Sequence, residues 1–422
     1  MIKFLLFLKK LRSNLIKLSL DKAEYKSSYN NLTMHLNVNS NCNAKCKFCE
    51  LRKQPTKELS DVILYEYLLP LYPKTDVVVP TYGEYTISSK VYNYLTWLME
   101  KFPHINLLTE TNGINFNEKW QEFSADNLVR TSCSLNAINA KRYQETVWEG
   151  EGGEAAYTKT INNLRNYQKL LKEKGLEDFG TRLSMVLTPD NYCDIPEFVR
   201  LALELNSCFV TLFFDVYNLD IINTPKRPLV ERALDTLLEL DTLLRGHFFL
   251  FYKLYTPFDS KFISERKKQL KLSKEELKEK YKDIWELAQY RNIKEEYKRR
   301  TEIRNKQGKA PISFLRELTI TGSQYILNGK DVDFCTLPWD HLLLTTEGYV
   351  NICSWYCNTK VRRPHISEFV KDGKLDSDAL FNSVFYKYQR HNMKTKKYVG
   401  CMKNCPYKNA EFKKYYTSLI NS

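Results

Sequence analysis

Three closely spaced cysteines are the residues of this chain best suited to chemistry. Cys42, Cys46 and Cys49 follow one another with the spacing C-x3-C-x2-C. Three thiolates on one short loop can hold three irons of an iron–sulfur cubane and leave the fourth iron open to a substrate. The same thiols could instead belong to a zinc site completed by a distant cysteine or by His35, which is poorly spaced from the loop. Spacing alone therefore leaves both metals open.

A second group of cysteines lies near the other end of the sequence and comprises Cys335, Cys353, Cys357, Cys401 and Cys405. Four or five thiols suffice for a complete iron–sulfur cluster or a zinc site, and their spacing does not choose between the two. The chain has eleven cysteines in all, an odd number, and no export signal is visible in its first residues. We therefore expect a cytoplasmic protein without a disulfide framework.

Alternating strands and helices are expected to position the first cysteine group. Apolar and β-branched runs predict strands at 32–38, 77–79, 105–110, 129–135, 181–187 and 208–216, with helical patterns between them. Six such repeats favour a parallel sheet, because a right-handed crossover between parallel strands needs a helix. The predicted fold class is α/β, a partial (β/α)6 TIM-like barrel. Chemistry in such barrels lies at the carboxyl ends of the strands, and the cysteine loop follows the first strand.

The first cysteine loop resembles that of a known enzyme family. The segment LNVNSNCNAKCKFCE, with Phe48 before its last cysteine, is similar to the cluster loop of radical S-adenosylmethionine (SAM) enzymes. The resemblance implies that Cys42, Cys46 and Cys49 bind a [4Fe–4S] cluster and that Phe48 is one of the cofactor-binding residues. It also implies that the unique iron of this cluster chelates the amino and carboxylate groups of SAM.

The end of the second predicted strand carries a glycine–glutamate pair, Gly83 and Glu84. A glycine lets the backbone approach a ligand closely, and a carboxylate can accept from an ammonium group. The same enzyme family has a glycine–glutamate motif here that holds the amino group of SAM, so the resemblance assigns both residues to SAM binding. Tyr82 stands in place of the usual second glycine and Tyr85 in place of a common proline. Because of these two departures, the backbone around Gly83 and Glu84 need not follow the path that it takes in the family.

Two further strand ends match the family. Asn112 and Gly113 follow the third predicted strand, where the family often has the same pair. Ser134 ends the fourth, where a family serine often meets the ribose or carboxylate of SAM, and Asn136 is a weaker candidate nearby. The resemblance therefore adds Ser134 to the SAM-binding residues. No catalytic acid or base can be named from the sequence.

The second cysteine group resembles the auxiliary-cluster domains of the same superfamily, called SPASM or, in a shorter form, twitch. The segment CTLPWDHLLLTTEGYVNIC is similar to their hairpin, and ALFNSVFYKYQRHNM is similar to the helix before their last cysteines. The resemblance implies one auxiliary [4Fe–4S] cluster on Cys335, Cys353, Cys401 and Cys405. Cys357 would exchange with one of these ligands or stay free.

Four segments of different composition are expected along the chain. They are a basic N-terminal extension at 1–30, the barrel at 31–256, a charged helical insertion at 257–316 and a small C-terminal α+β iron–sulfur domain at 317–422. More than half of the net charge of +14 falls in 261–309, which we interpret as a solvated helical pair and not as a nucleic-acid surface. No transmembrane segment is expected. The extension could touch a membrane surface, although packing on the barrel is preferred.

The resemblance also implies a reaction. An electron from a flavodoxin- or ferredoxin-type donor would let the protein cleave SAM to methionine and a 5′-deoxyadenosyl radical, which abstracts hydrogen from a peptide, a protein or a small molecule. The auxiliary cluster would transfer electrons. One alternative is a small-molecule enzyme, such as a sugar or cyclitol dehydrogenase. Another is a zinc-ribbon protein that binds RNA through its basic helices.

Overall fold

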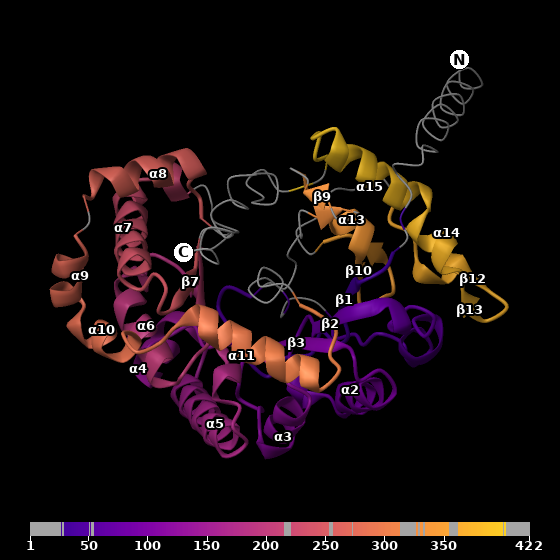
Figure 1. The fold of residues 1–422 in the computed structure, drawn as a ribbon, viewed down its shortest axis with the longest axis horizontal. Coiled ribbons are helices and arrows are strands. Elements are labelled where there is room, and N and C mark those ends of the chain that lie inside the picture. The colour runs from indigo at the N-terminus through magenta and orange to yellow at the C-terminus, as the bar shows by residue number, and fades with distance from the viewer. Residues whose placement is uncertain are drawn as a thin grey trace.

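The computed structural model describes residues 27, 29–49, 51, 55–214, 221–252, 256–271, 273–312, 326–327, 330–331, 334–353, 362–399 and 401. Cys357, Cys405 and nearly all of the predicted N-terminal extension lie outside the described residues. The described part is a mixed α/β fold built on one nine-stranded sheet (Figure 1).

This sheet has the strand order β11-β10-β1-β2-β3-β4-β5-β6-β7. The strands are β1 (Leu32–Asn37), β2 (Thr75–Thr81), β3 (Asn106–Thr111), β4 (Arg130–Ser134), β5 (Arg182–Leu187), β6 (Phe209–Phe214), β7 (Phe249–Phe251), β10 (His341–Leu344) and β11 (Val350–Asn351). All neighbouring pairs are parallel except β10 and β11, which form an antiparallel hairpin. The predicted α/β class and partial barrel are confirmed, and all six predicted strands are present.

Two features of the sheet were not predicted. The short strand β7 extends it beyond β6. At the other edge β10 pairs in parallel with β1, with Thr33 opposite His341, so the C-terminal hairpin continues the barrel sheet. Pairing between strands so far apart in the chain leaves no local pattern in the sequence. The predicted domain boundaries stay a prediction.

Amphipathic helices surround the sheet. The helices α2 (Ser89–Lys101), α3 (Glu118–Asp126), α5 (Gly153–Glu173), α6 (Ile195–Glu204) and α7 (Arg227–Leu243) follow one another around its outer side (Figure 1). Side chains at their starts satisfy free backbone N–H groups: Ser88 accepts from Val91 N before α2, and Asn117 accepts from Trp120 N before α3. None of the described helices has the length and hydropathy needed to cross a bilayer.

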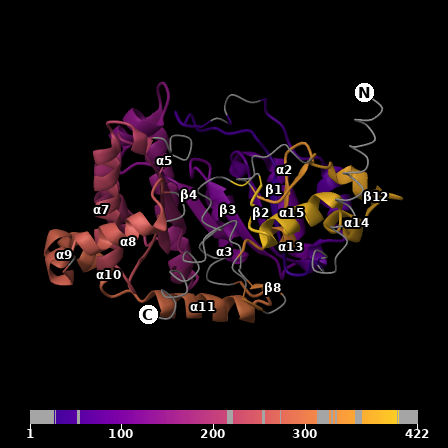
Figure 2. The same cartoon turned by 90° about the horizontal axis from the view of Figure 1, so that it is seen from above.

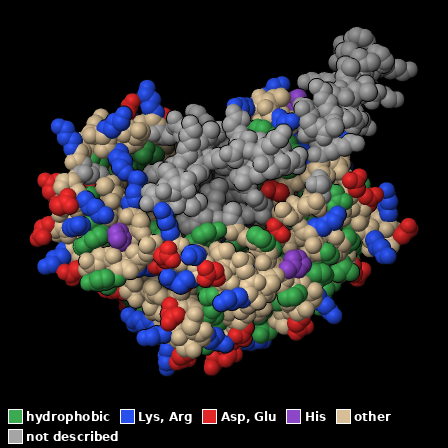
Figure 3. All heavy atoms as spheres, in the orientation of Figure 1, with side chains coloured by type: hydrophobic (Ala, Val, Ile, Leu, Met, Phe, Trp, Pro, Cys, Tyr) green, Lys and Arg blue, Asp and Glu red, His purple; other side chains and the backbone are tan. Residues whose placement is uncertain are grey.

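The described residues of the charged insertion form four helices, where a helical pair was expected. They are α8 (Ser260–Gln269), α9 (Lys274–Lys280), α10 (Lys282–Ala288) and α11 (Ile293–Lys306). α8 and α9 pack on α7, and α10 packs on α6. Figure 3 shows Lys and Arg side chains interspersed with Asp and Glu on the face it draws. This arrangement agrees with a solvated helical surface more than with a basic groove.

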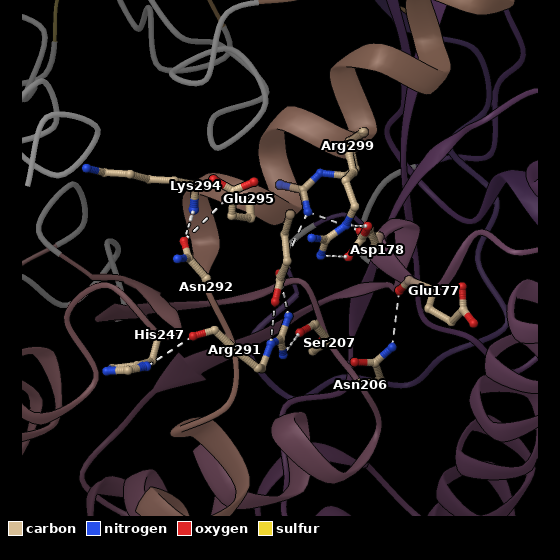
Figure 4. Close-up of polar contacts among 12 residues, drawn as sticks. Glu177, Asp178, Asn206, Ser207, His247, Arg291, Asn292, Lys294, Glu295 and Arg299 are labelled. Carbon is tan, nitrogen blue, oxygen red and sulfur yellow. Dashed lines mark hydrogen bonds and ion pairs between the residues drawn. The ribbon is translucent and has the colours of Figure 1, made fainter.

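The helix α11 covers the amino ends of the strands, at one side of the barrel in Figure 2. Arg291 and Arg300 donate to backbone carbonyls that precede β6 and β5, Ser207 O at 2.7 Å and Asp178 O at 3.1 Å. Figure 4 shows this contact region, in which Arg291 also forms a two-pronged ion pair with Glu296 at 2.9 and 2.8 Å. The insertion is thereby fixed to the barrel by partly buried charge-assisted hydrogen bonds.

The chain after α11 enters the barrel from the same end. Ile312 is buried against Val77, Val79 and Leu108, which come from neighbouring strands β2 and β3. Apolar side chains thus fill the interior near the amino ends of these strands. A ligand of the barrel would therefore approach from the carboxyl ends.

The Arg291–Glu296 pair predicts an unequal effect of two arginine substitutions. Arg291→Met leaves the Glu296 carboxylate, whose side chain is 9% exposed, without its main partner, so we expect a loss of about 3 kcal/mol in the free energy of unfolding. Arg299→Met removes a pair in which the arginine is 52% exposed, and should cost less than about 1 kcal/mol. Urea denaturation of both variants checks this. Equal losses would contradict it.

Lys309 predicts a pH dependence of stability. Burial, with a smaller effect from Arg304, lowers the pKa of Lys309 to about 8 from its usual 10.5. Between these values the unfolded chain holds a proton that the folded chain has released, so stability rises with pH. Lys309→Met should therefore be more stable than the wild type near pH 7, and this advantage should shrink by up to ~3 kcal/mol toward pH 10.

Urea denaturation at several pH values measures this difference, with Lys306→Met as the control because Lys306 is exposed. The difference in the free energy of unfolding between the control and the wild type should not change with pH. A flat difference for Lys309→Met as well would show that the burial of its ammonium group does not affect folding.

Candidate active site

The carboxyl ends of β1 to β4 lie side by side, and each carries one of the motifs singled out from the sequence. Asn37 is opposite Thr81, Thr111 is opposite Cys133, and Ser134 at the end of β4 is opposite Ser184 of β5. The parallel sheet therefore brings the cysteine loop, the glycine–glutamate pair, the Asn112–Gly113 turn and Ser134 to one edge.

The cysteine loop is held by backbone pairing with the segment that follows β4. Lys47 N donates to Val147 O and Glu149 N donates to Lys45 O, both at 2.8 Å, and Cys46 forms an isolated bridge with Trp148. Cys42, Cys46 and Phe48 are partly buried and pack against an apolar cluster that contains Tyr143 and Trp148. The loop thus has a fixed path along the barrel edge. Tyr143 and its neighbours were not predicted to support it.

The carboxylate of Glu84 joins the ends of β2 and β3. It is 1% exposed. Its Oε1 accepts from Thr86 N at 3.2 Å, Thr86 Oγ1 at 2.6 Å and Thr111 Oγ1 at 2.7 Å, and its Oε2 accepts from Asn112 N at 2.6 Å. Burial raises the pKa of Glu84, and these hydrogen bonds oppose the rise. A ligand ammonium group would find free acceptor capacity mainly on Oε2.

The neighbouring glycine makes close backbone contact with the base of the cysteine loop. Gly83 has φ +126°, and a Cβ there would lie 2.6 Å from both Asn39 O and Asn41 O. Glu84 N donates to Asn41 O at 2.8 Å, and Asn39 Nδ2 donates to Glu84 O at 3.0 Å. Only a residue without a side chain permits this approach. Glycine at this position is thus required by the contact with the loop. Its role in SAM binding stays a prediction.

Tyr82 stands where the resembled motif has a second glycine. It adopts φ +78°, a left-handed conformation that glycine favours and tyrosine seldom takes. Such strain costs of the order of 1–3 kcal/mol and is maintained only by surrounding contacts. The turn after β2 therefore keeps a glycine-like backbone without the second glycine.

Ser134 and Asn136 lie where β4 meets β5. Ser134 is half-buried, and its Oγ accepts from Ser184 Oγ at 3.3 Å. Asn136, with φ +62°, accepts from Val186 N at 2.9 Å and donates to Ser134 O at 3.0 Å. Asn136 thus joins the two strand ends, whereas the hydroxyl of Ser134 stays near the surface of the edge.

A charged pair inside the barrel was missed by the sequence analysis. Arg182 Nη2 donates to Glu110 Oε1 at 2.8 Å, and its Nε donates to Ser132 Oγ at 2.8 Å. The Arg182 side chain is 5% exposed and that of Glu110 is 43% exposed. The available signal was one ionisable residue in each of two predicted strands. This pair adds charged groups to the interior of the barrel.

The thiols of the loop fit a thiolate-ligated metal cluster in donor type. Burial raises the pKa of Cys42, while the Ala44 N–H and the Asn112 amide lower it. Cys46 and Cys42 both raise the pKa of Tyr143 beyond the effect of its burial, which is the main cause. The thiols of Cys42 and Cys46 thus both lie near Tyr143. Within the described ranges, however, no three His, Cys, Asp or Glu side chains are grouped so that they could hold a metal ion.

His35 does not join the cysteine loop. It lies within β1, is buried, and its Nε2 is 2.5 Å from Thr81 Oγ1. Burial lowers the pKa of His35 to about 4, which keeps its ring neutral at ordinary pH. The described residues therefore give no support to a zinc site of three cysteines and this histidine.

The described cysteines of the second group lie around the C-terminal hairpin and helix α15 (Val384–Lys394). Cys335 and Cys353 are buried at the two ends of the hairpin region, and Cys401 follows α15. Arg390 of α15 is buried and donates from Nε to Pro338 O at 2.9 Å, and Tyr386 Oη donates to His341 O at 3.0 Å. These bonds place the helix against the start of the hairpin. Cys401 is partly buried against the same apolar cluster as Cys335 and Cys353.

Several solved structures have the same fold. A structure of anSMEcpe with bound AdoMet matches with a TM-score of 0.51 and 14% identity, over 93% of this chain and 98% of that chain. Streptococcus suis SuiB bound to its precursor peptide SuiA matches with a TM-score of 0.53 and 14% identity, over 97% of this chain and 77% of that chain. SuiB bound to S-adenosylmethionine matches with a TM-score of 0.51 and 14% identity, over 92% of this chain and 75% of that chain.

No family model matches the chain, and neither does any curated protein. At 14% identity, the likeness to anSMEcpe and SuiB establishes the fold and nothing finer. The chain thus has the partial barrel of proteins whose structures hold S-adenosylmethionine.

The contact between Gly83 and the cysteine loop predicts an effect of a single methyl group. Gly83→Ala should cost about 1–3 kcal/mol more in the free energy of unfolding than Gly152→Ala. Both glycines have positive φ, but a Cβ at Gly152 meets nothing within 4 Å, whereas one at Gly83 meets two backbone oxygens. Thermal and urea denaturation check this. Equal losses of unfolding free energy in the two variants would show that the cysteine loop can shift to accommodate the added methyl group without destabilising the fold.

Proposed function

We propose that this chain is a radical SAM enzyme that modifies a peptide or protein. The observation that carries the proposal is the C-x3-C-x2-C loop at the carboxyl end of β1, in backbone contact with the Gly83–Glu84 turn of β2. Three thiols on one loop suit a [4Fe–4S] cluster with one open iron. The shared fold with AdoMet-bound anSMEcpe and SuiB supports the same conclusion.

In this proposal Cys42, Cys46 and Cys49 hold the cluster, which when bound supplies the electron that cleaves SAM. The turn at Gly83 and Glu84 and the hydroxyl of Ser134 orient SAM at the barrel edge. Phe48 and Tyr143, in the apolar cluster beside the loop, limit the access of water, which protects a reactive radical from side reactions. Because Ile312 fills the amino-end side, substrate enters from the carboxyl ends.

A peptide or protein substrate is preferred over a small molecule. SuiB has been solved with its precursor peptide SuiA, and anSMEcpe with a bound peptide. The sugar or cyclitol dehydrogenase has no comparable support. The zinc-ribbon RNA-binding alternative is disfavoured, because His35 lies apart from the loop and the charged helices mix both signs.

The finer assignments belong to the same proposal. Cys335, Cys353, Cys401 and Cys405 hold one auxiliary [4Fe–4S] cluster in a SPASM- or twitch-like domain, which exchanges electrons with the substrate. A flavodoxin- or ferredoxin-type protein is the electron donor. The order of Cys335 and Cys353 around the β10–β11 hairpin, with Cys401 after α15, supports this arrangement.

Anaerobic reconstitution tests the proposal. The wild type should hold about eight irons per chain, as two [4Fe–4S] clusters, and after reduction by dithionite it should release 5′-deoxyadenosine from SAM. Replacing Cys42, Cys46 and Cys49 together by Ala should remove four of these irons and all SAM cleavage. The control is Cys193→Ala, at an exposed cysteine that belongs to neither cysteine group. This variant should keep the full iron content and the cleavage of SAM.

Two outcomes would refute the assignment. SAM cleavage that persists in the triple cysteine variant would remove the loop from the reaction. Zinc in place of iron in the reconstituted wild type, without SAM cleavage, would revive the binding-protein alternative.

A further inference from the structure

A side-chain amide connects the end of β3 to the first cysteine of the loop. Asn112 Nδ2 donates to Cys42 Sγ at 3.6 Å and to Asn43 Oδ1 at 2.7 Å. Sulfur is a large and polarisable acceptor, so its hydrogen bonds are longer than those to oxygen. The amide therefore places a positive N–H edge against one of the three loop thiols.

The orientation of this amide follows from a third contact. The Oδ1 of Asn112 accepts from Ile114 N at 2.9 Å. A backbone N–H can only donate, so the side-chain atom that it meets must be the oxygen. The nitrogen of the same amide then faces Cys42, and the reversed orientation would set two donors against each other.

The backbone of Asn112 is fixed on both sides. Its N–H donates to Glu84 Oε2 at 2.6 Å, and its carbonyl accepts from Thr160 Oγ1 at 3.1 Å. Asn112 is 8% exposed. Little conformational freedom is left to lose when the amide meets a ligated sulfur, so the contact is preorganised.

We propose that Asn112 is a positioning residue that raises the reduction potential of the cluster held by Cys42. This inference rests on the proposed function. One-electron reduction by an external reductant adds one negative charge to the cluster, part of which reaches the cysteine sulfurs. An N–H donor stabilises the more negative state more strongly, and hydrogen bonds to the sulfurs are one of the factors that set such potentials.

The proposal gives Glu84 a second role besides SAM binding, which is to hold Asn112 in position. Its carboxylate accepts from the N–H of Asn112, and the side chain of Asn112 in turn donates to Cys42. The turn after β2 and the turn after β3 thus act on one ligand sulfur. A residue motif expected to contact SAM is thereby linked to the electronic properties of the iron site.

The midpoint potential of the reconstituted protein tests the inference, followed by EPR or visible absorbance during an anaerobic reductive titration. Asn112→Leu keeps the side-chain size and removes the donor. We expect an equilibrium constant for one-electron reduction lower by about tenfold, ~59 mV, as for the loss of one charge-assisted hydrogen bond. Asn115→Leu is the control: Asn115 lies in the same turn and donates to Thr86 O at 3.3 Å. Its potential should equal that of the wild type.

Asn112→Ser is the second variant, because its small polar side chain lowers the risk of misfolding. An unchanged potential in either Asn112 variant overturns the inference and leaves the proposed function standing. So does a failure of both variants to load a cluster while their circular dichroism stays native, since Asn112 would then serve assembly. A wild type that binds no iron–sulfur cluster refutes the proposed function itself.

Discussion

The buried carboxylate of Glu84 is the interaction on which the candidate site depends. Removing an ionised carboxylate from water costs several kcal/mol unless hydrogen bonds replace the lost hydration. Here two backbone N–H groups and two hydroxyls from Thr86, Thr111 and Asn112 replace it. Because these donors lie on the turns after β2 and β3, the same bonds that satisfy the charge hold the two strand ends together.

The cysteine loop is in turn fixed from two directions. The Gly83–Glu84 backbone meets Asn39 and Asn41 at its start, and the segment around Val147 pairs with it further along. A metal site gains rigidity when the residues behind its ligands are themselves held by hydrogen bonds. The strained conformation of Tyr82, with φ +78°, is the local cost of that arrangement.

The far end of the barrel has a different task. There α11 and Ile312 cover the amino ends of the strands, and the Arg291–Glu296 pair secures the helix. The charged insertion, which in sequence reads as a solvated appendage, is therefore part of the barrel's closure. Some of its cations are paired with carboxylates of the insertion or of the barrel, as in Arg291–Glu296 and Arg299–Asp178.

The sequence by itself determined the parallel barrel, its six main strands and the place of the cysteine loop after the first strand. These follow from local periodicity and spacing, which a linear pattern records. Only the tertiary structure decided that β10 pairs with β1, that Ile312 enters the barrel, and that Glu84 and Asn112 reach the cysteine loop. Such contacts join residues far apart in the chain, and their geometry depends on the packing of the whole sheet.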